Sequence, residues 1–380
     1  MTPEFIDRID AVSPEDWDRL CPSDYPFTRH AFLASLEDSG SVGADTGWQP
    51  QHLLLRDDQG DLKAAMPVYR KDHSYGEYVF DWGWAQAYAE HGLDYYPKLI
   101  SAIPFTPCTG PRLLAAGQEA QYWPAAIAAL QQQTRTLGAS GWHCLFPDET
   151  QADALRPAGL AERTGCQFHW INRHYRNFDD FLGQLSSRKR KNLRKERRQV
   201  ADQGFHFQWK VGADIQDEDW TLFYGLYQLT YLKRSGHGGY LTPAFFRQLG
   251  ERMPEQTLMV QARLGEETIA AALFLFDRTT LYGRYWGCRA EFEFLHFETC
   301  YYQGLDFVLA RGLARFDGGA QGEHKLARGF EPRLTTSFHQ LVEPAFQEAV
   351  EHFVTRERAE VLGYRDAARA HLPYRQTDRQ

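Results

Sequence analysis

The 380-residue sequence lacks several kinds of segment, and each absence excludes a class of protein. It contains no run of about 18 apolar residues, so we expect no membrane-spanning helix and no membrane insertion. The opening stretch MTPEFIDRIDAVSPEDWDRL is polar and acidic and has no apolar segment of the kind found in signal peptides. We therefore expect a soluble protein of the cytoplasm.

Motifs for metals and common cofactors are also missing. The six cysteines are scattered and form no CxxC pair, which argues against a structural zinc site and favours reduced thiols. The sequence has no GxSxG, Walker A, HExxH or GxGxxG motif, so neither a hydrolase elbow nor a nucleotide-binding loop of those types is expected. We predict no metal site and no permanently bound cofactor.

Basic residues are scarce relative to acidic ones. The chain has 42 Lys and Arg against 50 Asp and Glu, a formal net charge of -8. This balance excludes a generally basic nucleic-acid-binding protein, so any anion-binding role must come from a local patch. Aromatic residues, in contrast, are abundant at 14%, and apolar residues reach 43%, which is enough for a sizeable core.

Two passages of the chain, near 50–147 and 257–330, share one order of predicted elements. Each begins with extended, β-prone runs joined by tight turns, such as the one at Asp58-Gln59-Gly60. Each continues into a helix and ends in a short strand. This order predicts an α/β (α+β) fold with two repeats, in which mixed sheets are flanked by helices.

The segment between the repeats is predicted to be mainly helical. We expect a first domain over 1–165, a second over 166–340 that includes a helical insert over 178–255, and a helical tail over 341–380. The closing run FDGGAQGEHKLARGFEP of the second repeat is predicted to be extended. On a strand, Glu323 and Lys325 would share one face and His324 would take the other, which argues against a metal cluster.

The run RKRKNLRKERR (188–198) is the one strong basic patch. On a helix, four of its cations would lie on one face, where they could bind the phosphates of a substrate: Arg188, Lys191, Lys195 and Arg198. The alternative is a solvated helix face without a ligand.

Four further residues fall in the first turns of the predicted helix at 293–311: His296, Glu298, Tyr301 and Tyr302. A carboxylate there is a candidate base, or else it complements the helix dipole. Lys325 and Arg328 are candidates to neutralise an acidic substrate, and Arg112 follows a proline-rich loop that is a candidate pocket wall.

Several of these runs resemble one family. LSSRKRKNLRKERRQVADQG and ARGLARFDGGAQGEHKLARGFEP are similar to segments of the FemAB ligases, which build peptidoglycan cross-bridges. Together with PCTGPR and HFETCYYQGLDF, they resemble the FemAB-like predicted N-acyltransferases, which are related to the GNAT enzymes, over about 5–340. The family's lysine in F-K-x-G-F aligns with Ala327, and EFEFLHFETC replaces the pyrophosphate loop of CoA-dependent GNAT enzymes.

The resemblance implies two tandem GNAT-like domains that meet at a cleft and transfer an acyl group to an amine by direct attack. The donor would be an acyl-CoA or an aminoacyl-tRNA, and the acceptor a small-molecule or peptide amine. We expect an acyltransferase of the class that transfers groups other than aminoacyl groups. Glu298 is the first candidate base and Glu323 the second, with His296 or His324 as proton relay and Tyr301 or Tyr302 as acid for the leaving group.

Further candidates would bind the donor: Arg188, Lys191, Lys195, Arg198, Lys325, Arg328 and Arg112. A backbone N–H of a splayed strand in the second domain would stabilise the oxyanion. The alternative is a non-catalytic module of the same fold that recognises a cell-wall peptide or an RNA.

Overall fold

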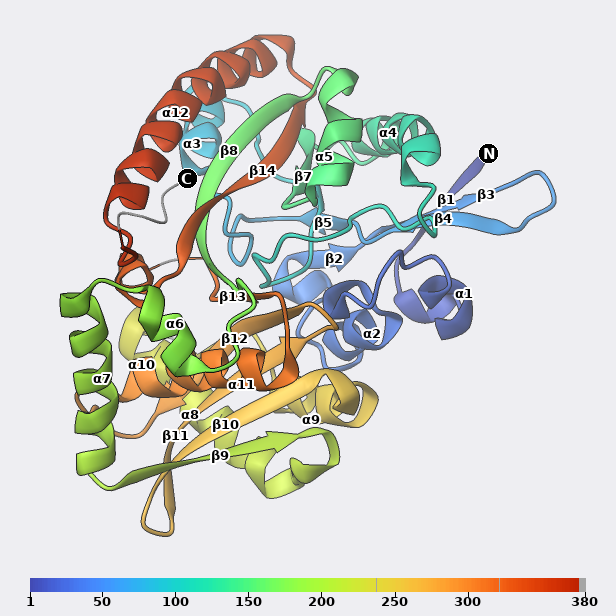
Figure 1. The fold of residues 1–380 in the computed structure, drawn as a ribbon. Helices are drawn as coiled ribbons and strands as arrows, with labels where there is room; N and C mark the ends of the chain where they lie inside the picture. The colour runs from blue at the N-terminus through green and yellow to red at the C-terminus, as the bar shows by residue number, and fades with distance from the viewer. Residues whose placement is uncertain (237, 321, 376–380) are drawn as a thin grey trace. The chain divides into compact units, whose positions relative to one another are not determined.

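The computed structural model describes residues 1–236, 238–320 and 322–375, which form two compact units (Figure 1). Unit 1 comprises Met1–Cys166 and Leu334–Gly363, and unit 2 comprises Gln167–Arg333 and the chain from Tyr364 onward. The predicted tail 341–380 is therefore divided between the two units, and its last five residues lie outside the described part. No helix of the described residues is long and apolar enough to cross a membrane.

Unit 1 contains two sheets. A small antiparallel sheet has the order β1-β3-β4, and five further strands lie side by side in the order β2-β5-β6-β7-β14. The turn predicted at Asp58-Gln59-Gly60 joins β3 to β4, which confirms that hairpin. The strands are β1 (Thr2–Ile6), β2 (Trp48–Pro50), β3 (His52–Arg56), β4 (Leu62–Met66), β5 (Tyr69–Lys71), β6 (Lys98–Ser101), β7 (Gly141–Leu145) and β14 (Glu331–Leu341).

Unit 2 has one mixed set of strands in the order β8-β13-β12-β11-β10-β9. All neighbours are antiparallel except β12 and β13, which run parallel. The chain enters unit 2 within β8 and leaves it within β14. The strands are β8 (Ala161–Ile171), β9 (Phe205–Val211), β10 (Thr257–Leu264), β11 (Glu267–Phe276), β12 (Thr280–Cys288) and β13 (Arg315–Asp317).

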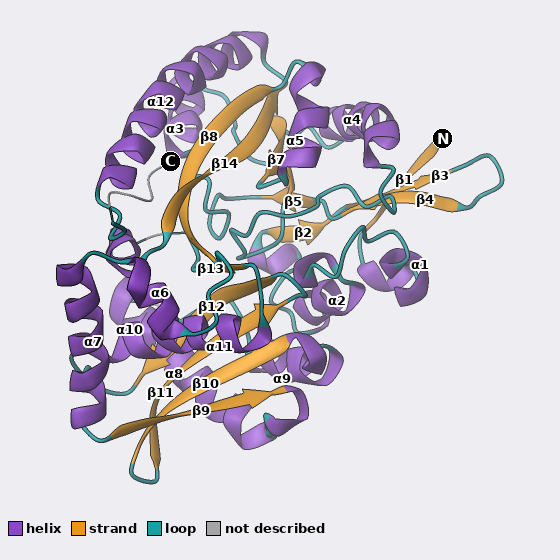
Figure 2. Ribbon diagram, viewed as in Figure 1, coloured by secondary structure: helices purple, strands orange, loops and turns teal. Residues whose placement is uncertain are grey.

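Helices alternate with these strands in both units (Figure 2). The α-helices of unit 1 are α1 (Pro14–Asp18), α2 (His30–Asp38), α3 (Trp82–Glu90), α4 (Glu119–Thr136) and α5 (Glu149–Leu155). Those of unit 2 are α6 (Phe178–Gln184), α7 (Ser187–Asp202), α8 (Asp217–Ser235), α9 (Pro243–Arg252), α10 (Leu295–Phe297) and α11 (Gln303–Arg311). The long α12 (Pro344–Ala370) passes from one unit to the other.

The remaining helical turns are short. One is a π-helical turn, η7 (Glu298–Tyr302), which lies between α10 and α11. The others are the 3-10 helices η1 (Ile9–Ala11), η2 (Pro26–Thr28), η3 (Ala44–Thr46), η4 (Arg156–Ala158), η5 (Gly212–Asp214), η6 (Pro254–Gln256) and η8 (Glu323–Arg328).

One prediction on local structure is incomplete and another is wrong. The insert over 178–255 is mainly helical, as predicted, but Phe205–Val211 within it forms β9 and pairs with β10. Its residues FHFQWKV place Phe205, Phe207 and Trp209 at alternate positions, the period of a strand. The run that contains the Glu-His-Lys triplet is not extended either: Glu323–Arg328 is the 3-10 helix η8, so the predicted sharing of faces does not apply.

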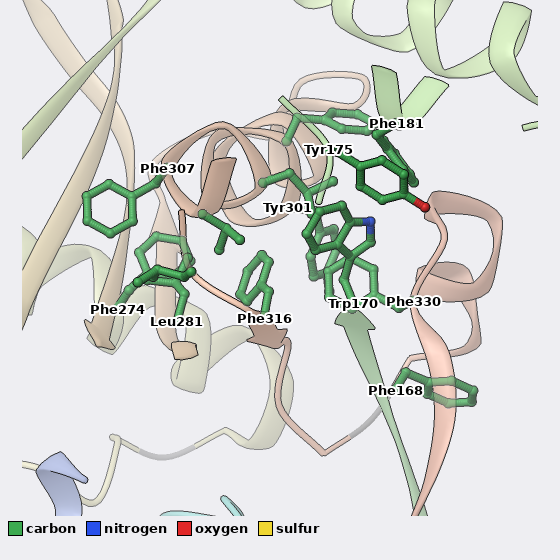
Figure 3. Packing of buried hydrophobic residues seen from close by; sticks show 14 of the residues in the cluster. Phe168, Trp170, Tyr175, Phe181, Phe274, Leu281, Tyr301, Phe307, Phe316 and Phe330 are labelled. Carbon is green, nitrogen blue, oxygen red and sulfur yellow. The ribbon is translucent and has the colours of Figure 1, made fainter. Parts of the chain in front are cut away.

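The core of unit 2 is aromatic, and it fixes the parallel strand pair against α11 (Figure 3). Phe316 of β13 is fully buried and packs on Phe330. A Cβ atom at Gly304 of α11 would lie 2.5 Å from the Phe316 ring, so only glycine allows this approach of helix and strand. On the other face of β12, Gly287 packs against Leu226 of α8 in the same way. Figure 1 shows α11 in front of these strands.

Candidate active site

Both units contain two parallel strands joined by a crossover helix, but the ends of the two pairs differ. In unit 2, β12 pairs with β13 only from Thr280–Arg315 to Tyr282–Asp317. There β13 ends, whereas β12 continues to Cys288. The register between β12 and β11 shifts at the same level, between Leu273 and Phe274, as it does at a β-bulge. The parallel pair of unit 2 therefore stops well before β12 does.

In unit 1, the corresponding place beside β7 is taken by the proline-rich loop. The N–H of Gly110 donates to the Phe146 carbonyl at 3.1 Å, and the N–H of Asp148 donates to Gly110 at 3.0 Å. Gly110 also forms a parallel bridge with Pro147. This loop continues the pairing along β7 after β6 has ended at Ser101.

Arg112 holds that loop in place. Its side chain has no exposed surface, and its guanidinium donates to four backbone carbonyls, those of Cys108, Gly110, Pro111 and Leu145, at 2.7–3.1 Å. A guanidinium satisfied in this way has little capacity left for a phosphate. We therefore do not propose Arg112 as a donor-binding residue, because its guanidinium holds the loop of unit 1.

In unit 2, three of the predicted residues lie beside the part of β12 that extends past the end of β13. The Tyr301 hydroxyl and His324 Nε2 are hydrogen-bonded at 2.9 Å. The His296 ring lies 5.4 Å from the Tyr301 ring and 6.0 Å from the His324 ring, measured between centroids. It also lies 5.1 Å from Trp286 of β12, beyond the stretch that pairs with β13. The π-helical turn brings Tyr301 to this position, and such turns are frequent at functional sites.

Both histidines of this cluster are neutral at pH 7. Burial and the charges of Lys325, Arg328 and Arg234 lower the pKa of His324 to about 4. Burial and neighbouring positive charge lower the pKa of His296 to about 3. Burial raises the pKa of Tyr301. The Tyr301 phenol therefore keeps its proton, and a neutral His324 can accept it through Nε2 while its Nδ1 carries the ring proton.

Glu298, the first candidate base, is engaged elsewhere. Its two oxygens accept from Nε and Nη2 of Arg197 at 3.1 and 2.9 Å, and Gln303 donates to one of them at 2.8 Å. Arg197 also donates to Asp306. Burial raises the pKa of Glu298, and the Arg197 charge opposes this rise. This buried ion pair joins α7 to η7 and α11, so we no longer propose Glu298 as the base.

Tyr302 and Glu323, the other predicted acid and base, are hydrogen-bonded to side chains outside the cluster. The hydroxyl of Tyr302 donates to Glu196 of α7, and Tyr302 is fully buried. Glu323 is exposed and accepts a hydrogen bond from Tyr364 of α12 at 2.8 Å. Neither is bonded to Tyr301 or His324, so we propose neither as an acid or base.

Lys325 and Arg328 of η8 are buried and position the cluster. The Lys325 ammonium donates to the Gly319 carbonyl at 2.8 Å. Arg328 donates to Glu196 at 2.6 Å and to the His324 carbonyl at 2.8 Å, and its guanidinium carbon lies 3.4 Å from the centre of the Phe297 ring. Both cations hold the segment that carries His324, and their charges lower the pKa of His324.

The basic helix predicted at 188–198 is α7, and it is amphipathic. Leu193 and Val200 are buried, whereas the four predicted cations are exposed. Within the described residues, none of these four takes part in a hydrogen bond or ion pair: Arg188, Lys191, Lys195 and Arg198. At 1.5 Å per residue, this row extends over about 15 Å. The described part of the chain therefore leaves these four charges open to a ligand.

A buried charged network in unit 1 was not predicted, although the lysine among the apolar residues of KLIS is a signal for it. Lys98 of β6 is 1% exposed and donates to Ser74, to Glu77 at 2.8 Å and to Asp81. Asp81 also accepts from Tyr95 at 2.7 Å. The network fixes the segment before α3 onto the sheet.

Two buried histidines extend this network. The Nδ1 atoms of His143 (β7) and His339 (β14) are 2.8 Å apart, and Ser337 is bonded to His339 Nε2 at 2.8 Å. Burial, with the Lys98 charge, lowers the pKa of His143 to about 3, and burial lowers that of His339 well below its usual value. Both rings are therefore neutral at pH 7.

The pair His143 and His339 is expected to weaken unit 1 in acid. In the unfolded chain each ring binds a proton near pH 6.5, whereas in the folded chain the pKa of His143 is lowered to about 3 and that of His339 lies well below its usual value. The free energy of unfolding therefore falls as the pH falls through this window, by up to about 1.4 kcal/mol per pH unit for each titrating ring. Urea unfolding between pH 7 and pH 4 measures this slope.

The matched comparison is the double variant His143→Gln, His339→Gln. Burial is the main reason that the pKa of Glu77 is raised to about 7, so between pH 7 and pH 4.5 this residue makes the free energy of unfolding rise as the pH falls. Glu77 is present in both proteins, so its contribution cancels in the difference. The wild type should lose stability relative to the variant as the pH falls. Parallel pH curves would show that the histidine pair does not control acid stability.

Comparison with known proteins places the chain in a family. Residues 8–376 match the FemAB-like family, which is described as peptidoglycan biosynthesis/recognition. The chain belongs to the FemAB-like family. Comparison with curated proteins gave no match.

Solved structures share the fold at low sequence identity. FemX is 10% identical, with a TM-score of 0.55, and the match covers 92% of this chain and 100% of FemX. L-PGS from Bacillus licheniformis is 11% identical, with a TM-score of 0.51, and the match covers 88% of this chain and 98% of that one. A tandem GNAT protein from the clavulanic acid biosynthesis pathway is 10% identical with a TM-score of 0.47, over 90% of this chain and 99% of that one.

The predicted fold of two tandem GNAT-like repeats with mixed sheets and helices is confirmed. The family and the fold together support a transferase of acyl or aminoacyl groups. They give no support to the predicted exclusion of aminoacyl groups.

Proposed function

We propose that this FemAB-like protein is an N-acyltransferase whose chemistry takes place in unit 2. The observation that supports this most is the bond between Tyr301 and His324 beside the part of β12 that extends past β13. A neutral imidazole bonded to a phenol can accept a proton through it. In unit 1, the corresponding place is filled by the loop that Arg112 holds.

In the proposed reaction, the neutral amine of the acceptor attacks the carbonyl carbon of the donor's ester or thioester. The amine proton passes to the Tyr301 oxygen as the Tyr301 proton passes to His324 Nε2. The tetrahedral intermediate then expels the carrier's hydroxyl or thiol, which receives a proton back from His324 through Tyr301. A backbone N–H of β12, beyond the stretch that pairs with β13, would stabilise the oxyanion.

The carrier is proposed to bind along the exposed basic face of α7. A row of cations about 15 Å long suits several successive phosphates of a polynucleotide better than the compact phosphates of CoA. Glu291 and Glu293 are exposed just before α10, where a pyrophosphate would meet their negative charge. An aminoacyl-tRNA is therefore the favoured donor, acyl-CoA the second, and a small-molecule or peptide amine the acceptor.

Salt dependence of donor binding tests this assignment. Replacing all four cations of the α7 face by Gln should weaken binding of aminoacyl-tRNA and make the slope of log K against log salt shallower by about three, because phosphate contacts are lost. A control protein carries four exposed arginine replacements elsewhere, Arg19→Gln, Arg135→Gln, Arg356→Gln and Arg369→Gln, and has the same net charge. If both variants lose the same slope, α7 is not the carrier site.

The same binding experiment addresses the alternative of a non-catalytic module. Tight binding of aminoacyl-tRNA or a cell-wall peptide without any transfer from tRNA or CoA carriers to an amine would favour that alternative and reject the proposed reaction.

A further inference from the structure

Three cations from two different elements lower the pKa of His324. Lys325 and Arg328 belong to η8 and are buried, and their bonds are to Gly319, Glu196 and the His324 carbonyl. Arg234 lies in the last turn of α8. It is exposed and has no hydrogen bond or ion pair within the described residues, yet its charge lowers the pKa of both His296 and His324. Of these three cations, only Arg234 is exposed.

Arg328 supplies a second sign of a missing partner. Its Nη1 and Nη2 atoms are hydrogen-bonded, but its Nε is buried and has no partner among the described residues. The residue is 3% exposed. An unsatisfied buried donor is unfavourable, and more so when it is charged. An oxygen atom that entered beside His324 would supply the missing acceptor.

We propose that Arg234 and Arg328 form a subsite for an oxyanion, a carboxylate or a phosphate, that the acceptor substrate carries near its reacting amine. The assignment of the ligand to the acceptor depends on the proposed acyl transfer, whereas the binding of an oxyanion does not. The acceptor would thus be an amine with a nearby acidic group, such as an amino acid, a peptide or an amino sugar phosphate.

Occupation of this subsite would also activate the base. In the free protein, the charges of Lys325, Arg328 and Arg234 lower the pKa of His324, which is bonded to the Tyr301 hydroxyl and lies near the neutral His296 ring. The two carboxylates on or beside this element are engaged, Glu323 by Tyr364 and Glu196 by Arg328. An oxyanion among these cations would cancel part of their effect and make His324 more basic. Acceptors with the acidic group would then meet a stronger base than neutral amines do, which is a form of substrate selection.

Ring-proton NMR of His324 in the full-length protein tests the subsite without turnover. The resonance is assigned by its loss in His324→Gln. Titration with inorganic phosphate in one series and with acetate in another should raise the pKa of His324 by about one unit or more, with saturation. The series with the tighter binding indicates which oxyanion the subsite prefers.

The matched variants are Arg234→Gln and Lys233→Gln. Lys233 precedes Arg234 on the same turn but lies 3.8 Å from Glu291, so its loss should leave the phosphate or acetate effect unchanged. Arg234→Gln should weaken the effect at least tenfold in anion concentration. The subsite would be overturned if neither phosphate nor acetate shifted the pKa of His324, or if the shift were equal in Arg234→Gln and Lys233→Gln.

Failure of this inference can be told apart from failure of the proposed function. A pKa that responds to anions in a protein that transfers no acyl group would reject the reaction and keep the subsite. Equal transfer to acidic and neutral amines, with an unresponsive His324, would reject the subsite and keep the reaction.

Discussion

His324→Ala is expected to lower kcat/KM for amide formation by about 10²- to 10⁴-fold, the usual contribution of general acid–base catalysis. The reason is that the Tyr301 phenol, whose pKa burial raises, cannot take the amine proton unless it passes its own to His324 Nε2. Tyr301→Phe should have a comparable effect, because it removes the oxygen that links amine and imidazole. The measurement is single-turnover transfer from aminoacyl-tRNA or acyl-CoA to hydroxylamine, a small amine that needs no specific acceptor site.

Glu298→Gln is the matched control for this experiment. Glu298 lies in the same helical segment as Tyr301, but it is bonded to Arg197 and Gln303. Its replacement should keep the rate per folded molecule within about threefold, less than 1 kcal/mol of barrier, and should lower the stability of unit 2. A large loss of rate in folded Glu298→Gln, with His324→Ala near wild type, would return the role of base to the carboxylate.

Lys98→Met is expected to destabilise unit 1 by about 3–5 kcal/mol. Lys98 is the cation between Glu77 and Asp81, and all three side chains are buried. Removing it leaves two buried carboxylates without their main counter-ion, which is more costly than losing the attraction itself. Urea unfolding at pH 7, followed by a signal from unit 1, measures the change.

A surface lysine provides the control for Lys98. Lys63→Met removes an equal charge from ion pairs with Asp57 and Asp61 at the surface, and we expect a change within about 0.5 kcal/mol. Adding Glu77→Gln and Asp81→Asn to Lys98→Met should recover part of the loss, because the unpaired charges are then gone. A triple variant less stable than Lys98→Met alone would show that the carboxylates do not depend on the lysine.

The repeated order of elements could be predicted from the sequence because it depends on local signals. Alternation, turn residues and helix periodicity lie within a few residues of one another, as in the β3–β4 hairpin and in α7. The strand β9 was missed because its alternation is short and lies inside a helical segment. The helix η8 was missed because the whole run was assigned to the closing strand of the second repeat. Gly322 and Gly329, which adopt positive φ angles, instead mark the two ends of a helical turn.

The members of the site could be named from the sequence, but their partners could not. Tyr301, His296 and His324 were among the candidates because such residue types move protons. The partner of Glu298, Arg197, precedes it by 101 residues, so only the tertiary fold reveals that the carboxylate is neutralised. In the same way, nothing in the sequence near Arg112 indicates that four carbonyl groups surround it.

The most direct test of acyl transfer by unit 2 is hydroxamate formation. Full-length protein is incubated with hydroxylamine and, in turn, a pool of aminoacyl-tRNAs or of acyl-CoAs, and the hydroxamates are identified by mass spectrometry. Relative to the uncatalysed reaction of hydroxylamine with the same ester or thioester, we predict faster hydroxamate formation from at least one pool with the wild type. We predict no acceleration with the double variant Tyr301→Phe, His324→Ala, and undiminished acceleration with Lys63→Met. Two results would contradict the proposed site: equal hydroxamate formation by the wild type and the double variant, or no enzyme-dependent hydroxamate from either pool.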